Sequence, residues 1–143
     1  MIASGGDDRA TGIWPVVAIF VVAVAMMLPS LGGAPLAGTE GHRALSAHQM
    51  VESGDWLVPQ LYGRTYLRKP PLHYWLIATT EMLTGRADEL IWRLPTALEY
   101  GALAGLLTWA GGRLFGRHGA WASGVGFLAI VPLWAQARTA DID

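Results

Sequence analysis

Residues 13–31 read IWPVVAIFVVAVAMMLPSL, and this stretch decides the expected fold. It lies within residues 10–39, none of which is charged. A helix needs about 20 mostly apolar residues to cross a hydrocarbon core of about 30 Å. The stretch therefore predicts a first transmembrane helix, residues 12–32, behind an N-terminal segment of residues 1–11. Removal as a signal sequence stays an alternative, because Ser30-Leu31-Gly32 fits a cleavage site.

Two further apolar stretches predict two more transmembrane helices. Residues 96–112 follow Pro95 and end at Gly111-Gly112, and residues 119–137 carry no charge. Residues 113–118 then form a turn on the same side of the membrane as residues 1–11, and residues 33–95 and 138–143 lie on the other side. The distribution of Arg and Lys leaves the orientation ambiguous, because the long loop holds more of them than the short turn.

The composition agrees with an integral membrane protein. The chain is 52% hydrophobic and only 15% charged, with a mean hydropathy of +0.34. A net charge of −1 argues against nucleic acid as a partner. The absence of cysteine excludes disulfides and zinc-thiolate sites within the sequence.

The loop of residues 33–95 is predicted to contain two helices around a bend. Thr39 is the expected N-cap of a helix over residues 40–53, which Gly54 ends in a left-handed conformation. Pro59 and residues 62–65 predict an extended arm with a turn. A second helix opens at Pro70-Pro71 and ends at Gly85. Its apolar residues recur on one face, as in a helix that lies in the membrane interface; they are Leu72, Trp75, Leu76, Thr79, Met82 and Leu83.

Residues 54–75, GDWLVPQLYGRTYLRKPPLHYW, carry a specific resemblance. They resemble the first external loop of the membrane glycosyltransferases related to the lipid A aminoarabinose transferases and the protein O-mannosyltransferases. Residues 40–44, 50–55, 93–97 and 113–116 resemble the same family in order and spacing, so the resemblance covers residues 12–143.

The resemblance implies an all-α integral membrane protein of the glycosyltransferase C type. Three transmembrane helices and an external loop with two interfacial helices would be its N-terminal fragment. The family moves a sugar from a polyprenyl-phosphate carrier to a lipid or protein acceptor, with inversion at the anomeric carbon. By resemblance, the chain is a multi-pass protein of the bacterial inner membrane whose active site faces the exterior, and it acts in lipid A modification or protein mannosylation. The same resemblance implies that residues 1–11 and 113–118 are cytoplasmic and that residues 33–95 and 138–143 are external. The fragment alone is expected to be inactive.

Acidic residues are the first candidates for catalysis. The family carries an Asp-Glu pair where this chain has Thr39-Glu40, so the resemblance assigns the catalytic role to Glu40. A Glu in the first turn of a helix is also explained by the helix dipole alone. Asp143 matches the acidic position of the second external loop, with Asp141 as the alternative in register. Glu40 and Asp143 together could hold a divalent cation, which prefers oxygen ligands.

Basic residues are the candidates for donor binding. Lys69 precedes the Pro-Pro helix start, where an ammonium group and free N–H groups can face a phosphate. A lysine reaching lipid headgroups is the simpler alternative. Arg68 would add a second cation. Tyr66 is the third candidate, although packing explains Tyr66 and Tyr74 more simply.

The remaining titratable residues give no catalytic pattern. His42, His48, His73 and His118 lack metal-ligand spacing and are interpreted as polar surface or interface residues. Glu99 is interpreted as an acid with access to water near the end of its helix. Two rival functions stay open. One is a polyprenyl-phosphate binding or transport protein without chemistry, which the loss of the family Asp at Thr39 favours, and the other is an inactive truncated product.

Overall fold

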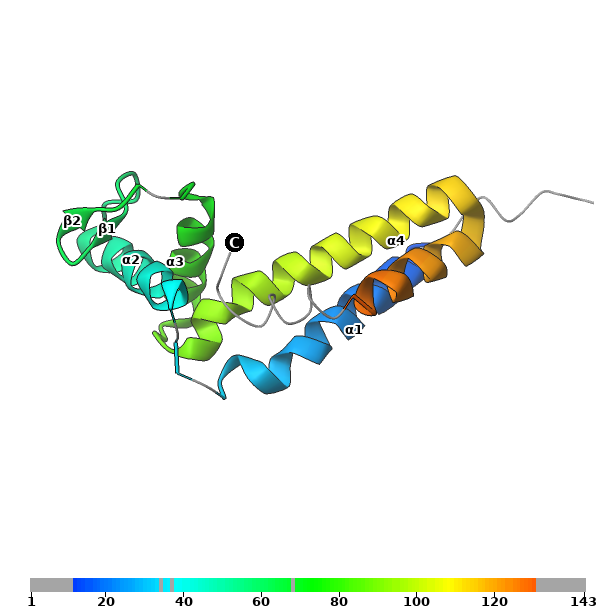
Figure 1. The fold of residues 1–143 in the computed structure, drawn as a ribbon, viewed down its shortest axis with the longest axis horizontal. Coiled ribbons are helices and arrows are strands. Elements are labelled where there is room, and N and C mark those ends of the chain that lie inside the picture. Colours follow the sequence, from blue (N-terminus) through cyan, green and yellow to red (C-terminus); the bar gives the residue numbers. More distant parts are fainter. Residues whose placement is uncertain (1–11, 34, 37, 68, 131–143) are drawn as a thin grey trace, which may run out of the picture.

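The computed structural model describes residues 12–33, 35–36, 38–67 and 69–130, and it has two parts (Figure 1). A lobe contains the helices α2 (Thr39–Ser53) and α3 (Leu72–Thr84) with the two short strands β1 (Gln60–Leu61) and β2 (Arg64–Thr65). An elongated arm contains α1 (Trp14–Leu31) and most of α4 (Glu89–Leu128). The first turns of α4 lie beneath the lobe, so α4 joins the two parts.

The helices of the lobe end where the sequence predicts. Gly54 follows α2 with φ 73°, and Gly85 follows α3 with φ 65°; each donates its backbone N–H to the last turn of its helix. Both positions need the left-handed region that glycine adopts at little cost. The expected N-cap at Thr39 is wrong. Gly38 holds that position, Thr39 is already helical, and no side chain caps this end.

A two-residue turn joins the strands of the lobe. Gln60 pairs with Thr65 and Leu61 with Arg64 in an antiparallel register. Tyr62 and Gly63 form the turn and both have positive φ, of 53° and 72°. Two positive φ values are the signature of the type I′ turn, whose twist matches that of a β-hairpin. The predicted extended arm is therefore a small hairpin.

Helix α4 starts earlier than expected and reverses within itself. Asp88 caps it, with one carboxylate oxygen accepting from the backbone N–H of Ile91 at 3.1 Å, and Pro95 lies inside the helix instead of opening it. At Gly116 the backbone leaves the helical conformation, with φ 70° and ψ −164°. The segment of α4 after Gly116 runs back alongside α1 and the segment of α4 before Gly116 (Figure 1).

Glycines allow the two segments of α4, before and after Gly116, to approach closely. A Cβ on Gly111 would collide with Ser123 and lie only 2.6 Å from the carbonyl oxygen of Gly119. A Cβ on Gly124 would collide with Thr108 and lie 2.8 Å from a side-chain carbon of Ile19. Gaps this small have room for a hydrogen atom only, so these glycines set how closely the two segments of α4 and α1 pack.

Two apolar cores hold the parts together. The arm core lies between α1 and α4 and consists of Ile19, Ala23, Met27, Leu31, Ala97, Tyr100, Ala104 and Phe127. The lobe core lies between α2 and α3 and consists of Ala47, Met50, Tyr74, Ile77 and Ala78. Trp92 of α4 packs against the lobe core, which fixes the lobe to the start of α4.

The expectation of three transmembrane helices is wrong for the described residues. Among the described residues, no helix combines the length and the apolar character that crossing a bilayer requires. α1 has 18 residues with prolines near both ends, and Arg93, Glu99 and Arg113 interrupt the apolar stretches of α4. The helix expected over residues 119–137 ends at Leu128, and residues 131–137 lie outside the described ranges.

Candidate functional site

A cavity lies where α3 begins, against α4. It has a volume of about 270 Å³ and is lined by Lys69, Pro70, Leu72, His73 and Glu99. Pro70 and Pro71 bring the chain into α3 because their fixed φ suits the start of a helix. The N–H groups of the first turn have no carbonyl partner within a helix and carry the positive end of its dipole. The cavity therefore has Lys69 and a helix N-terminus at its wall, two features that attract anions.

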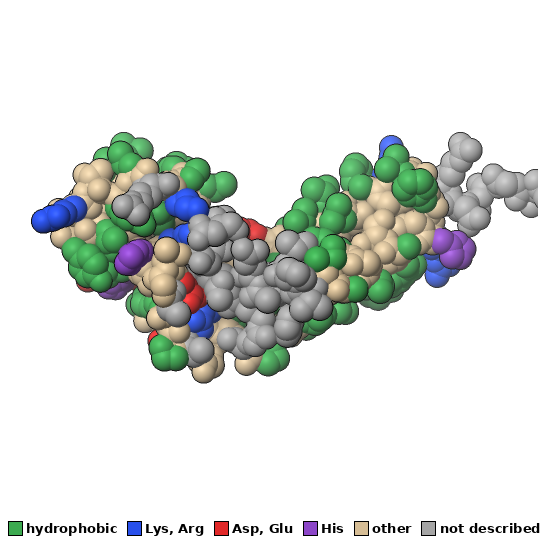
Figure 2. Space-filling view, viewed as in Figure 1, with side chains coloured by type: hydrophobic (Ala, Val, Ile, Leu, Met, Phe, Trp, Pro, Cys, Tyr) green, Lys and Arg blue, Asp and Glu red, His purple; other side chains and the backbone are tan. Residues whose placement is uncertain are grey.

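Figure 2 shows how charge is distributed on one face of the molecule. Acidic and basic side chains gather over the lobe and at its junction with the arm, and again at the far tip of the arm. The middle of the arm is green and tan on this face, which marks apolar and uncharged groups. The cavity thus belongs to the charged end of the molecule.

His73 is the most unusual side chain of the cavity. It is 5% exposed, and its Nδ1 lies 3.5 Å from Oε1 of Glu99 on α4. Its other nitrogen, Nε2, is buried and has no hydrogen-bond partner among the described residues. A buried polar atom without a partner costs free energy, so such an atom needs a physical explanation. Glu99 itself is 47% exposed and reaches solvent beside the cavity.

Glu40 lies in a separate cluster, in a buried ion pair with Arg93. Nε of Arg93 donates to Oε1 of Glu40 at 2.6 Å, and Nη2 donates to Oε2 at 3.0 Å. Only 2% of Glu40 and 3% of Arg93 are exposed. The hydrogen bond to Glu40 raises the pKa of Arg93 above its ordinary value, against the opposing effect of burial. Arg93 is therefore charged, and the Glu40 carboxylate is its partner.

Arg93 also closes the C-terminal end of α1. Its Nη1 donates to the carbonyl oxygen of Leu31 at 2.7 Å, and its Nη2 lies 3.4 Å from the carbonyl oxygen of Pro35. The last carbonyls of a helix lack intrahelical donors, and a cation there is favoured by the dipole. One guanidinium group thus joins α1, α2 and α4.

The sequence-predicted site residues are not brought to one place. Lys69 lines the cavity, whereas Glu40 is held by Arg93. Tyr66 packs on the lobe core, and its ring meets the edge of His42 at a centroid distance of 6.1 Å. Arg68 and Asp143 lie outside the described residues. Since both oxygens of Glu40 already accept from Arg93, this carboxylate does not fit a cation ligand here, and the metal site of Glu40 with Asp143 stays a prediction.

A second polar network was missed by the sequence analysis. Glu81 of α3 is 5% exposed; its Oε1 lies 2.6 Å from Nδ1 of His48, and its Oε2 accepts from the indole N–H of Trp92 at 2.8 Å. The network joins α2, α3 and α4 beneath the lobe core. It satisfies both oxygens of a buried carboxylate, and so explains His48 and Glu81 as structural residues.

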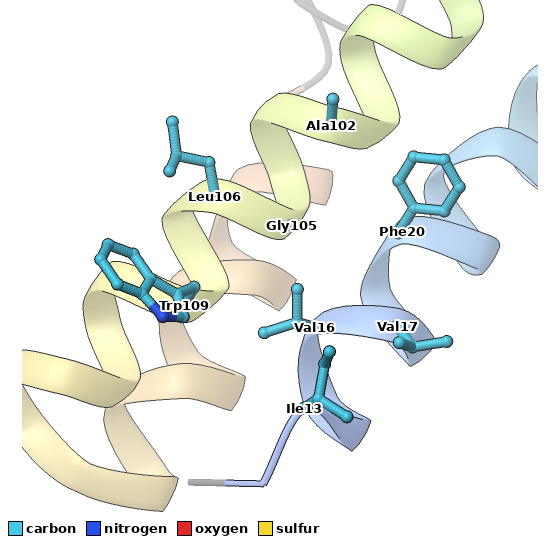
Figure 3. A pocket seen from close by; sticks show the side chains of 8 residues that line it. All are labelled: Ile13, Val16, Val17, Phe20, Ala102, Gly105, Leu106 and Trp109. Atoms are coloured by element: carbon cyan, nitrogen blue, oxygen red, sulfur yellow. The ribbon is translucent and has the colours of Figure 1, made fainter.

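An apolar groove lies on the arm, separate from the cavity at the start of α3. Its volume is about 630 Å³, and Figure 3 shows the eight residues that line it, from the start of α1 to Trp109 of α4. Val16 and Phe20 point from α1 toward α4, where Gly105 has no side chain to meet them. The lining offers no titratable side chain, so the groove suits an apolar group and not catalysis.

Two cavity residues, His73 and Glu99, were interpreted from the sequence as ordinary polar residues. They are 26 positions apart on two helices, so no local spacing relates them. The only sequence signal is that Glu99 interrupts an otherwise uncharged stretch, residues 94–112.

Comparison with known proteins finds relatives over part of their length. The arabinosyl transferase of Aeromonas salmonicida, named undecaprenyl phosphate-alpha-4-amino-4-deoxy-L-arabinose arabinosyl transferase, is 30% identical over 105 residues, which are 73% of this chain and 19% of that protein. The transferase of the same name from Sodalis glossinidius is 30% identical over 110 residues, or 74% of this chain and 19% of that protein. The chain is related to these arabinosyl transferases. This confirms the family resemblance on which the interpretation of residues 54–75 rested.

The relationship covers a small part of the aminoarabinose transferases. The chain spans about a fifth of the length of the curated relatives it matches. A shorter match, 39% identical over 46 residues, occurs with the transferase of Pseudomonas savastanoi and covers 32% of this chain and 9% of that protein. No protein-family model and no solved structure matches the chain.

Proposed function

We propose that the chain is the donor-binding part of a glycosyltransferase that takes a sugar from a polyprenyl-phosphate carrier. The observation that carries the proposal is the position of Lys69 in the cavity at the N-terminus of α3. The names of the relatives support it, because they specify undecaprenyl phosphate as the carrier of the sugar in those proteins.

Lys69 and the first turn of α3 would stabilise the leaving group. When the bond between the anomeric carbon and the phosphate oxygen breaks, the electron pair leaves with the polyprenyl phosphate. A fixed ammonium group and oriented N–H groups favour that developing charge, and interactions of this kind are usually the largest catalytic effect. Pro70 and Pro71 keep these groups in place before the substrate binds, which lowers the cost of ordering them.

The carrier determines where the protein acts. A polyprenyl phosphate is a lipid, so the reaction takes place at a membrane, and we place it at the external face of the bacterial inner membrane. The acceptor is a lipid or a protein. Because the chain spans about a fifth of its relatives, we expect residues 1–143 alone to bind the carrier without transferring sugar.

The test compares Lys69→Met with Arg117→Met in the full-length protein. Lys69→Met keeps the aliphatic stem and removes the charge, and Arg117 is an exposed cation at the far tip of the arm. Loss of one preorganised electrostatic group costs roughly 10²–10³-fold in kcat. We expect this loss for Lys69→Met and unchanged consumption of a polyprenyl-phosphate-linked sugar for Arg117→Met. Unchanged turnover in Lys69→Met would refute the assignment.

Carrier binding can be followed on the 143-residue chain itself. Lys69 is the only lysine of the sequence, so reductive methylation with ¹³C labels Lys69 and the N-terminal amine alone. Undecaprenyl phosphate in detergent micelles should shift the Lys69 methyl signal, whereas undecaprenol should not. Equal shifts with both lipids would show that the phosphate is not recognised.

A binding protein without chemistry is the second candidate. It is favoured by one observation, namely that Glu40 is occupied by Arg93 and is not available as a base in this structure. Such a protein would bind undecaprenyl phosphate through Lys69 and leave the sugar donor intact in the same assay.

A further inference from the structure

His73 and Glu99 form a carboxylate–imidazole pair that the proposed function does not yet use. Glu99 lies 3.5 Å from Nδ1, and both residues line the same cavity as Lys69. A carboxylate beside one ring nitrogen favours a proton on that nitrogen, and so determines which nitrogen keeps the lone pair. In neutral His73 the proton belongs on Nδ1, and Nε2 is a proton acceptor.

The acceptor nitrogen is buried and unsatisfied. Nε2 of His73 has no hydrogen-bond partner among the described residues, and only 5% of His73 is exposed. The other ring nitrogen, Nδ1, faces the Glu99 carboxylate, and the neighbouring cation is Lys69. Neither Glu99 nor Lys69 makes a hydrogen bond to Nε2. His73 lines the cavity, and a ligand hydroxyl that displaces the atoms covering Nε2 would supply the missing donor.

Resting on the proposed function, we propose that His73 is the general base that takes the proton from the acceptor hydroxyl, with Glu99 as its positioning residue. The proton passes from the acceptor oxygen to Nε2 of His73. The acceptor oxygen forms a bond to the anomeric carbon, the bond from that carbon to the phosphate oxygen breaks, and the electron pair leaves with polyprenyl phosphate beside Lys69. His73 is left as an imidazolium stabilised by the Glu99 carboxylate, and charge and atoms balance.

This assignment fits the other acids of the described chain. Glu40 is held by two donors of Arg93, and Glu81 by His48 and Trp92, so their oxygens are occupied. Glu99 is partly exposed and lacks the buried position of His73. His73 is the one buried imidazole at the cavity with an unsatisfied nitrogen in the described ranges.

The test measures sugar transfer and carrier binding in the full-length protein. His73→Ala should lower kcat roughly 10²–10⁴-fold, the range of general acid–base catalysis, with the KM for donor within threefold of the wild type. Glu99→Gln should lower kcat roughly tenfold, because the amide oxygen can still accept from Nδ1 but the charge that stabilises the imidazolium is removed. Added imidazole should restore part of the turnover of His73→Ala and none of that of Lys69→Met. His118→Ala, a change at an exposed histidine of the far tip, is the matched control and should leave turnover unchanged.

The outcomes separate the two proposals. Undecaprenyl phosphate should bind the His73 variants as it binds the wild type, and bind Lys69→Met more weakly. His73→Gln fills a similar buried volume without a base and should lose as much turnover as His73→Ala, so the test holds even if the alanine variant does not fold. Two results would overturn the role of His73 and leave the proposed function standing. One is full turnover in any folded His73 variant, and the other is a loss of carrier binding in the His73 variants as large as that in Lys69→Met. A wild-type protein that binds the carrier but consumes no donor would overturn the transferase function and the base together.

Discussion

Removing the charge of Arg93 should destabilise the fold more than any other single change at an ion pair of the described structure. Arg93→Met leaves the Glu40 carboxylate, 2% exposed, without its two donors, and it removes the donor to the carbonyl oxygen of Leu31. Removing one partner of a buried ion pair typically costs about 3–5 kcal/mol. That loss corresponds to a decrease of roughly 10²–10⁴-fold in the folding equilibrium constant at 25 °C.

The assay is equilibrium unfolding in urea, followed by far-ultraviolet circular dichroism. The exposed Arg113 on the same helix supplies the control, and Arg113→Met should stay within about 0.5 kcal/mol of the wild type. The double variant Glu40→Leu/Arg93→Met removes both charges, and we expect it to recover at least about 2 kcal/mol relative to Arg93→Met, because the uncompensated charge is gone.

Two results would refute this reasoning. An Arg93→Met variant within about 1 kcal/mol of the wild type would mean that water reaches Glu40 despite its burial. A double variant as unstable as the single one would mean that the contacts of Arg93 with the end of α1 matter, and that its pairing with Glu40 does not.

Three further predictions concern stability. Gly111→Ala should destabilise by about 1–3 kcal/mol through overpacking, whereas Gly126→Ala, whose Cβ meets no atom within 4 Å, should stabilise by up to about 1 kcal/mol; thermal unfolding of both variants tests this. Asp88→Ala should cost about 1 kcal/mol by removing the cap on the N–H of Ile91, and Asp88→Asn, which caps as well, should restore most of it in urea titrations. Burial raises the pKa of Tyr74 above its ordinary value, so its stabilising contribution is complete below pH 10.0 and is lost as the pH rises through the folded pKa. Tyr74→Phe should therefore unfold at a higher pH than the wild type in an alkaline titration, and an unchanged midpoint would show that Tyr74 does not limit alkaline stability.

Local signals account for the parts of the fold that the sequence predicted. Gly54 and Gly85 end α2 and α3 because each ending depends on one residue and its helix. The start of α4 was predicted at Pro95, because the apolar stretch begins there, but the cap at Asp88 comes first and turns Arg93 into a helical residue facing α1 and α2.

Long-range contacts account for what was missed in the site. Lys69 was predicted for the phosphate from its position before two prolines, and it lines the cavity. The resemblance assigned Glu40 a catalytic role, and nothing in the sequence relates Glu40 to Arg93, 53 positions later. His73 and Glu99 meet only because α3 packs on α4.

The reversal at Gly116 makes the arm sensitive to changes in chain length. One residue changes the direction of the chain, so no loop absorbs an added or deleted amino acid there. Deleting one residue after Gly116 would rotate the returning segment by about 100° about its own axis. Gly124 would turn away from Thr108, and a larger side chain would face Ile19 in its place. Natural variants of this protein should therefore tolerate substitutions in the returning segment far better than single-residue insertions or deletions between Gly111 and Gly124.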